Sequence, residues 1–173
     1  DRALAYARHF PSINWLTSYS EYIDDLKPWY DQNVSPKFMA DRQRIFTLLQ
    51  EEEQLLEIVK LIGSDVLPED QKLVLDTARL IRVGFLQQNS YNIIDTYVPL
   101  EKQFRMMELI LELYDGARKL LERSIPLSQL RATGIFDTLS KVKYEVPNDH
   151  QERFDGYHDQ IQAALRQVDE ANR

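Results

Sequence analysis

The amino-acid sequence predicts an all-α fold, a bundle-like helical domain from which a long antiparallel helical hairpin protrudes. Apolar residues recur at spacings of three and four along most of the 173 residues, which is the period of a helix face. Strict alternation of apolar and polar residues, the pattern of a half-buried strand, is nowhere convincing. A chain of this length buries roughly 70% of its unfolded surface, enough for one hydrophobic core. We therefore expect a single domain over residues 1–173.

The first predicted helix follows a proline. Pro11 interrupts any earlier helix because its ring removes a backbone donor, and Ser12 is a residue type that caps helix N-termini. The apolar residues that this short helix would carry are Trp15, Leu16, Tyr19, Tyr22, Ile23 and Leu26.

The first arm of the hairpin is predicted over residues 36–62. Ser35 followed by Pro36 is typical of a helix cap and its first turn. Gly63 would end this helix in the left-handed conformation that glycine adopts at little cost. The apolar face of the arm comprises Phe38, Ile45, Leu48, Leu49, Leu55, Leu56, Val59 and Ile62.

The second arm is predicted over residues 68–88, where Pro68 opens another helix. Its apolar face comprises Leu73, Leu75, Ala78, Leu80, Ile81 and Phe85. Because only a short turn separates the two arms, we expect them to pair antiparallel, with the tip of the hairpin at residues 63–68.

The rest of the chain predicts an irregular link and then three helices. Residues 88–98 are rich in Asn, Asp and β-branched residues and form the link. Pro99 then begins a strongly periodic helix, whose apolar positions include Phe104, Met107, Leu111, Tyr114 and Leu121.

A shorter helix is predicted over residues 128–143. The last helix is expected to begin at Asp149, because Glu152 three residues later completes the spacing of a capping box, and to extend to about Ala171.

Composition excludes several kinds of active site. The chain has no cysteine, which removes disulfide frameworks, thiol nucleophiles and iron–sulfur sites. Its 5 glycines compare with about twelve at ordinary usage and lie far apart. Neither a P-loop nor a dinucleotide-binding turn can form with glycines so dispersed. Since the histidines also lack the spacing of metal ligands, we expect no metal site.

The chain is acidic, with 21 basic residues against 28 acidic ones and a net charge of −7. Nucleic-acid binding needs basic surfaces, so we expect no nucleic-acid partner. No apolar run approaches the roughly 18 residues of a membrane span, so we expect no direct membrane insertion. The chain starts at Asp1 rather than at a methionine, which is expected of a piece cut from a longer protein and equally of a processed chain.

Most of the excess charge lies in residues 51–70. This segment holds one base, Lys60, and seven acids: Glu51, Glu52, Glu53, Glu57, Asp65, Glu69 and Asp70. The simplest interpretation is a solvated helix face and turn. The three consecutive glutamates point in different directions round a helix, so they cannot converge as an acid–base pair.

The sequence holds almost no candidate catalytic machinery. A serine nucleophile activated by His9 is one alternative, since three serines follow it closely: Ser12, Ser18 and Ser20. No carboxylate is spaced to orient that imidazole. His150 and His158 lie about two turns apart on a helix that we expect to be exposed, which is typical of surface residues.

Two aromatic strings are candidates for ligand binding. In Arg8–Trp15 (RHFPSINW) a Phe-Pro pair precedes a helix, and in Phe85–Tyr91 (FLQQNSY) amides and an aromatic ring crowd a helix end. Such groups can stack on a planar ligand and form hydrogen bonds with it. From the residues alone, core packing is the simpler interpretation of both strings.

Both strings resemble a known family. Arg8–Ser20 (RHFPSINWLTSYS) is similar, nearly letter for letter, to the segment that follows the nucleotide-binding domain in the catalytic A subunit of V/A-type rotary ATPases, and FLQQNSY resembles another of its strings. The resemblance extends over essentially the whole chain. It implies a C-terminal helical domain whose residues 1–15 are the link from the nucleotide-binding domain. The P-loop and the other catalytic residues would then lie upstream of Asp1, leaving none here and making the chain inactive by itself.

The more distant F-type β subunit resembles this chain too and implies roles for individual residues. Its Tyr-Pro pair, which lines the adenine pocket, matches Phe10 and Pro11, and the aromatic residue that packs on the adenine matches Tyr91, with Ser90 beside it. The string here is one residue longer than in that family. The implied cofactor of the parent subunit is ATP or ADP with Mg²⁺, not tightly bound by this chain alone.

The F-type loop that touches the rotor falls on residues 65–71. The resemblance implies a rotor contact made by Asp65, Val66, Leu67, Pro68, Glu69 and Asp70. Three positions, Val66, Pro68 and Gln71, depart from the residues of that loop, so a role that needs a dense carboxylate cluster does not carry over.

The resemblance also implies partners and a location. The parent would alternate with B subunits in a hexameric ring, contact central stalk subunits, and lie in the cytoplasm at the membrane surface. Its ATP hydrolysis or synthesis would be coupled to transport of H⁺ or Na⁺. Composition alone favours a different function, a free-standing acidic helical module that docks a basic partner.

Overall fold

The computed structural model describes residues 1–173, and every regular element in it is helical, which confirms the all-α prediction. The elements in chain order are α1 (Arg2–Tyr6), α2 (Ile23–Asn33), α3 (Phe38–Ile62), α4 (Glu69–Leu80), the π-helical segment η1 (Ile81–Leu86), α5 (Ile93–Thr96), α6 (Leu100–Glu122), α7 (Leu127–Ala132), α8 (Ile135–Glu145), the 3₁₀ turn η2 (Gln151–Arg153) and α9 (Phe154–Glu170). None of the helices combines the length and the apolar character needed to cross a membrane.

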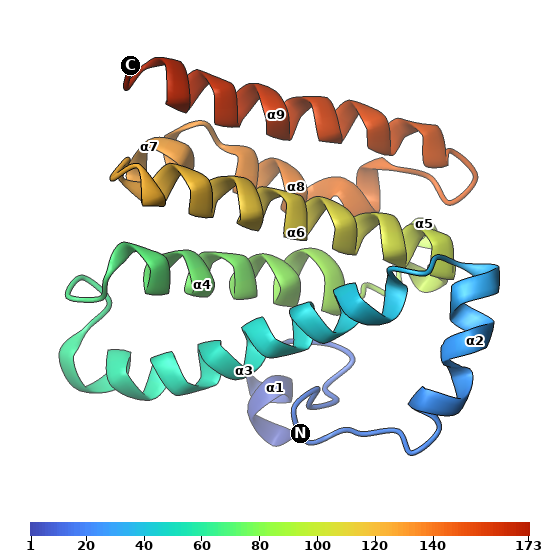
Figure 1. Cartoon of the computed structure of the whole chain (residues 1–173). Helices are drawn as coiled ribbons and strands as arrows, with labels where there is room; N and C mark the ends of the chain where they lie inside the picture. Colours follow the sequence, from blue (N-terminus) through green and yellow to red (C-terminus); the bar gives the residue numbers. More distant parts are fainter.

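The helices stack in layers around α6 (Figure 1). In that view α9 lies above α6 and α8, α4 and then α3 lie below them, and α2 stands across one end. α6 contacts α3, α4, α8 and α9. Its start one residue after Pro99 is as the sequence predicts. The apolar side chains of α6 at the centre of the core are Phe104, Met106, Met107, Leu109, Ile110, Leu111, Leu113, Ala117 and Leu120.

α3 and α4 run antiparallel and are joined by residues 63–68 (Figure 1). α4 is a core helix, because Leu73 and Ala78 have no exposed surface, whereas Leu61 near the end of α3 is 85% exposed. Among the apolar residues of these two helices and their connection, the most exposed therefore lie at the end of α3 and in the connecting loop. Gly63 combines a φ of 83° with a ψ of 161°, so the left-handed helical conformation predicted for it is wrong. The positive φ still favours glycine.

The prediction that a helix follows Ser12 is wrong, because α2 begins only at Ile23. Asn14 explains the difference. Its side-chain oxygen accepts hydrogen bonds from the backbone N–H groups of Leu16 (2.8 Å) and Thr17 (3.1 Å). An asparagine that satisfies nearby backbone donors in this way favours a turn over a helix.

Two further boundaries in the C-terminal part differ from the prediction. Gly134 adopts the left-handed conformation, with φ 77° and ψ 5°, and divides the helix predicted over residues 128–143 into α7 and α8. The capping box predicted at Asp149 is also wrong, because α9 begins at Phe154 after a 3₁₀ turn and neither element has a side-chain cap.

The helix predicted over residues 68–88 changes character at Ile81, where α4 passes into η1. η1 packs against α8, and Gly84 is buried there. A Cβ atom on Gly84 would lie 3.1 Å from Ser140 Cα of α8 and 3.1 Å from Leu80 Cδ1. Even a methyl group would therefore push α8 away from η1.

The close packing around Gly84, and the open space around Gly156, predict opposite effects for substitution of these two glycines. Gly84→Ala should lower the free energy of unfolding by about 1 kcal/mol, because overpacking outweighs the gain in helix propensity. Gly156→Ala in α9, where an added Cβ has no neighbour within 4 Å, should raise it by up to about 1 kcal/mol. Urea denaturation of both variants tests this, and an equal stabilisation by both would contradict the tight η1–α8 contact.

Candidate functional site

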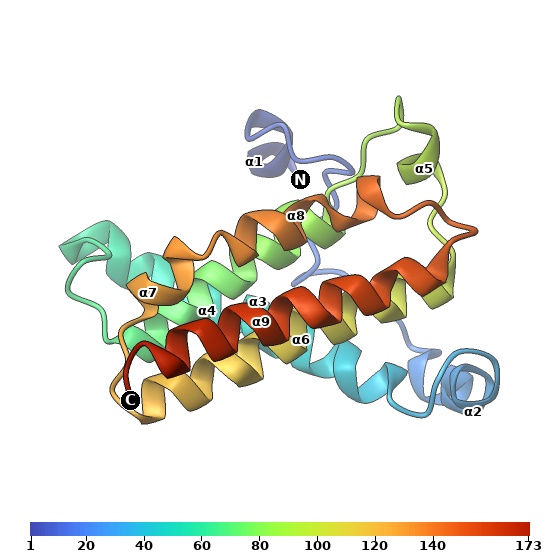
Figure 2. The ribbon, with the colours of Figure 1, turned by 90° about the horizontal axis from the view of Figure 1, so that it is seen from above.

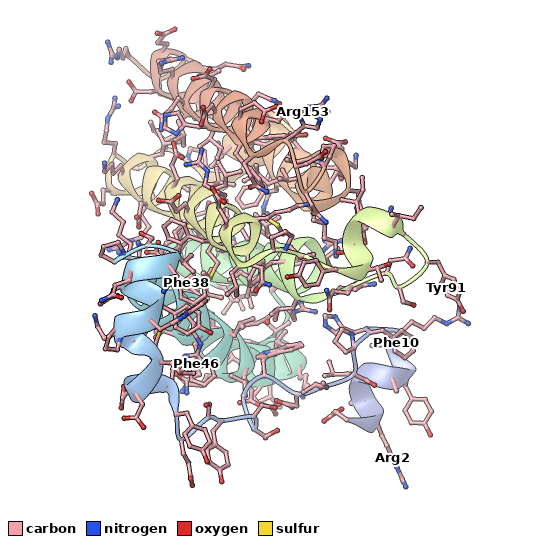
Figure 3. The ribbon with its side chains drawn as sticks, turned by 90° about the vertical axis from the view of Figure 1, so that its right-hand side faces the viewer. Arg2, Phe10, Phe38, Phe46, Tyr91 and Arg153 are labelled. Atoms are coloured by element: carbon pink, nitrogen blue, oxygen red, sulfur yellow. The ribbon has the colours of Figure 1, made fainter.

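The two aromatic strings meet in the folded chain. The backbone N–H of Gln88 donates a hydrogen bond of 2.7 Å to the carbonyl oxygen of Phe10. Figure 2 shows α1 and α5, which flank this contact in the sequence, on the same side of the bundle. In Figure 3 the side chains of Phe10 and Tyr91 lie on one side of the molecule. The residues that the resemblance implies for the site therefore come from two segments that are far apart in the sequence and contact each other in the fold.

The structure divides each string into packed and exposed members. Trp15 and Phe85 pack against the core, as the core interpretation predicts. Phe10 is 51% exposed and Tyr91 is 97% exposed, so neither ring serves the core. Pro11 and Ser90 are exposed as well. The four residues proposed for adenine binding thus all lie at the surface.

Three consecutive residues of the second string are held through their backbone groups. The carbonyl of Gln87 accepts a hydrogen bond from Lys143 Nζ, and Gln88 N–H binds Phe10. Asn89 N–H donates to Asp95 Oδ2 at 2.6 Å. We call residues 87–91 the 87–91 loop. Its first half is tied to the N-terminal segment, to α5 and to α8.

The second half of the loop is held by local polar contacts. Asn89 Oδ1 accepts from Tyr91 N–H at 3.0 Å, and Thr96 Oγ1 donates to the carbonyl of Ser90 at 3.2 Å. Asn92 caps α5 by accepting from Ile94 N–H at 2.9 Å. An exposed tyrosine ring is therefore presented by a loop whose backbone groups are largely satisfied.

A cluster of buried charges lies beneath the loop, and we call Asp95, Lys102 and Lys143 the buried charge cluster. Asp95 Oδ2 and Lys143 Nζ are 3.6 Å apart, and each side chain is only 1% exposed. Burial lowers the pKa of Lys143, and the Asp95 carboxylate opposes that change. Asp95 also lines a cavity of about 200 Å³ together with Phe85 and Gln88.

Lys102 has no exposed surface. Its ammonium group donates to the carbonyls of Lys143 (2.8 Å) and Val146 (2.6 Å) and to Asn148 Oδ1 (3.0 Å). Both carbonyls lie at the C-terminal end of α8, where carbonyls lack helical partners and the helix dipole favours a cation. Burial nevertheless lowers the pKa of Lys102 to about 8, against the attraction of Asp95.

Periodicity and motif spacing do not identify the buried charge cluster. Lys102 precedes Met106, Leu109 and Leu113 at helical spacing, so it occupies a position on the buried face of α6. A lysine at a core position is a detectable signal, because such residues are almost never fully buried unless their charge is satisfied. The partners themselves come from segments more than forty residues away, which periodicity does not reveal.

The serine hydrolase alternative has no support in the structure. His9 is buried with its ring edge-on to Trp15, the ring centroids being 5.2 Å apart. Burial, and then the nearby Arg82 and Lys143, lower the pKa of His9. The hydroxyls of Ser18 and Ser20 make local backbone contacts instead. A core role accounts for His9.

The residues predicted to touch the rotor fall into two groups. Asp65, Val66, Pro68 and Asp70 are exposed. Leu67 is buried, and the Glu69 carboxylate accepts from Leu127 N–H at 2.8 Å and from Lys72 Nζ at 3.1 Å. These hydrogen bonds lower the pKa of Glu69, the backbone bond most. Glu69 therefore caps α7 across the loop, in addition to any contact with a partner.

The acidic segment is not uniformly a solvated face, which corrects the interpretation from sequence. Glu52 is buried and forms a two-pronged ion pair with Arg82, whose Nε and Nη2 lie 3.0 Å and 2.8 Å from its oxygens. Glu57 pairs with Lys60 at 2.5 Å. Less free negative charge is left for a basic partner, which weakens the interaction-module alternative.

The four candidate residues suit a nucleobase better than a phosphate, because none of them carries a charge. Phe10 and Tyr91 offer planar rings for stacking. Lys143, the cation beneath the loop, is buried and already bound to Gln87. The chain has no group of three or more His, Asp or Glu side chains arranged to hold a metal ion.

Known proteins resemble this chain over most of its length. Residues 27–131 match the family described as the C-terminal domain of V and A type ATP synthase. The V-type ATP synthase alpha chain 2 of Clostridium tetani is 52% identical over 149 residues, which cover 86% of this chain and 25% of that relative. The V-type ATP synthase alpha chain of Halothermothrix orenii is 45% identical over 154 residues, which cover 89% of this chain and 26% of that relative. The chain thus spans about a quarter of the length of these relatives.

Lys102 should make the free energy of unfolding depend on pH in a way that can be tested. Its pKa is about 8 in the folded chain and about 10.4 when unfolded, so above pH 8 the folded state loses this proton first. Stability should therefore rise with pH in this window. Relative to Lys102→Met, the free energy of unfolding of the wild type should increase by about 2 kcal/mol between pH 8 and pH 10. Urea titrations of both proteins at each pH measure this difference. If the free energy of unfolding changed equally with pH in the two proteins, the buried ammonium of Lys102 would be contradicted.

Proposed function

Since the chain belongs to the family of C-terminal domains of V- and A-type ATP synthases, we propose that it serves the catalytic subunit of a rotary ATPase. In this role it supplies one wall of the adenine pocket. It also couples ATP hydrolysis or synthesis to rotation of the central stalk and to transport of H⁺ or Na⁺. The parent subunit would alternate with B subunits in a hexameric ring and lie in the cytoplasm at the membrane surface.

The observation that carries this proposal is the joining of the two strings by the Gln88–Phe10 hydrogen bond. It holds Phe10 and Tyr91 on one side of the molecule with both rings exposed. Stacking on an aromatic ring stabilises a bound base by about 1–3 kcal/mol. When a nucleotide is bound, its phosphates and Mg²⁺ would supply the phosphoryl-transfer chemistry. This chain's own rings would orient the base and exclude water from it.

Further exposed apolar residues on the same segments support a role within a larger protein. Tyr6 is 87% exposed, Ile13 63%, Ile93 92% and Tyr97 74%. Ile13 lies within the first string, and the other three residues lie within six positions of one of the two strings. In the proposed role this surface would contact the nucleotide-binding domain of the parent close to the bound nucleotide.

The loop at residues 63–68 is the tip of the proposed lever, the hairpin of α3 and α4. It lies at the opposite end of the molecule from α5 (Figure 1). Closing of the parent's nucleotide-binding domain would swing this end against the stalk, a hinge motion. Val66 is 62% exposed at the tip, whereas exposed ion pairs contribute only about 0–1 kcal/mol each and are screened beyond about 8 Å. We expect the tip to push mainly by its shape.

Removal of the Tyr91 ring tests the adenine contact. In the full-length protein, assembled in its ATPase complex, Tyr91→Ala should raise the KM for ATP by roughly 5- to 100-fold through lost stacking. Steady-state hydrolysis measures this. Tyr22→Ala, which removes an equally large exposed ring outside both strings, is the matched control and should leave KM unchanged.

An unchanged KM in Tyr91→Ala would contradict the adenine assignment. The 173-residue chain alone should show no hydrolysis and bind ATP no more tightly than about 1 mM by calorimetry, since that affinity already requires about 4.1 kcal/mol. Micromolar affinity would show a more complete nucleotide site than the one proposed.

Removal of the exposed tip carboxylates tests the lever. The double variant Asp65→Ala/Asp70→Ala should keep most of the torque in single-molecule rotation of the assembled complex, because screened surface charges contribute little. Glu69 is left in place because it caps α7. The control Glu51→Ala/Glu53→Ala removes as many exposed acids from α3. Near-total loss of torque in the tip variant alone would overturn the shape-based account.

A further inference from the structure

Three backbone groups in a row fix the start of the 87–91 loop, and each partner comes from a different part of the fold. Lys143 of α8 binds the Gln87 carbonyl, the N-terminal segment accepts the Gln88 N–H, and Asp95 of α5 accepts the Asn89 N–H. Two of the three partners are the side chains that form the buried ion pair. The Lys143–Asp95 pair therefore holds the loop at Gln87 and at Asn89. These residues lie on either side of Gln88, whose N–H binds the first string.

We propose that the Lys143–Asp95 pair is a positioning element for nucleotide binding, which holds the 87–91 loop so that Tyr91 faces the base beside Phe10. The inference rests on the proposed function, because it assumes that Tyr91 contacts adenine. Neither charged group touches the base. Both act through the backbone of Gln87 and Asn89.

The pair connects the loop to the rigid part of the bundle. Lys143 belongs to α8, in which Leu139 and Val142 are core residues, while Asp95 belongs to α5, which follows the loop. Each side chain is 1% exposed, so removing one leaves the other charge buried without its partner. A buried unpaired charge is costly enough to drive local rearrangement. The loop, with its exposed Tyr91, is the part best able to move.

The far end of the same region is held from the bundle as well. Asn148 Nδ2 donates to the carbonyls of Ile94 (3.1 Å) and Tyr97 (2.7 Å). Lys102 in turn donates to Asn148 Oδ1. Residues 87–97 are thus anchored at both ends, by the buried charge cluster and by Asn148. Loss of Lys143 would release the end that carries the 87–91 loop and leave the other end attached.

The test compares two lysines on α8. Lys143→Met removes the buried ammonium, and Lys141→Met removes an exposed one that pairs only with Asp137 at the surface. In the 173-residue chain, amide hydrogen exchange followed by NMR should become at least tenfold faster at Gln88 and Asn89 in Lys143→Met. Exchange in the core of α6 should change far less. Lys141→Met should leave both regions unchanged.

The functional readout is the division between KM and kcat in the assembled complex. Lys143→Met should raise the KM for ATP about tenfold with kcat changed less than about threefold, because a mispositioned loop weakens binding of the base and leaves the phosphates in place. Unchanged exchange at Gln88 and Asn89 would overturn the proposal. So would equal acceleration in α6, which would show a general loss of stability.

Asp95→Asn keeps the inference falsifiable if Lys143→Met fails to fold. The amide oxygen can still accept from Asn89 N–H, but the charge is lost, so local acceleration at Gln88 and Asn89 is again expected and its absence would overturn the proposal. The exchange result does not depend on ATP. If Tyr91→Ala leaves KM unchanged while Lys143→Met accelerates loop exchange, the proposed function fails and the loop-holding role of the pair stands.

Discussion

The chain must accommodate the ammonium groups of Lys102 and Lys143 and the carboxylate of Asp95 beneath the 87–91 loop, and most of the candidate site follows from how it does so. Moving a charge out of water costs several kcal/mol unless hydrogen bonds and opposite charges replace the solvent. Here the replacements are the free carbonyls at the end of α8, Asn148, and the backbone of the 87–91 loop. Satisfying these charges therefore fixes α5, α6 and α8 relative to one another.

α4 and η1 connect the two regions proposed to be functional. α4 begins next to the tip loop with Glu69, and its continuation η1 ends where the 87–91 loop begins. Leu73, Ala78 and Ile81 along this path have no exposed surface, so the path is part of the core. A displacement at the 87–91 loop would therefore be carried by packed helical segments to the loop at residues 63–68. This is the arrangement that a lever requires.

How much the sequence could predict depends on the range of the interaction concerned. The helix after Pro99 was predictable because a long periodic face and a proline act locally. The two strings could also be recognised in the sequence, but their contact in the fold depends on one long-range hydrogen bond between Gln88 and Phe10. Glu69 accepts a hydrogen bond from Leu127 N–H, 58 residues away, which periodicity does not reveal either. Asn14 and Asn148 act through side-chain contacts that periodicity does not describe.

The two strings form one site only if the hydrogen bond from Gln88 to Phe10 joins them in solution. Scalar coupling across that bond, between the Gln88 amide nitrogen and the Phe10 carbonyl carbon, tests it directly by NMR on the isotopically labelled chain. The structure predicts a measurable coupling and a Gln88 amide protected from exchange. A Gln88 amide that exchanges as fast as an unfolded one and shows no coupling to Phe10 would contradict the account.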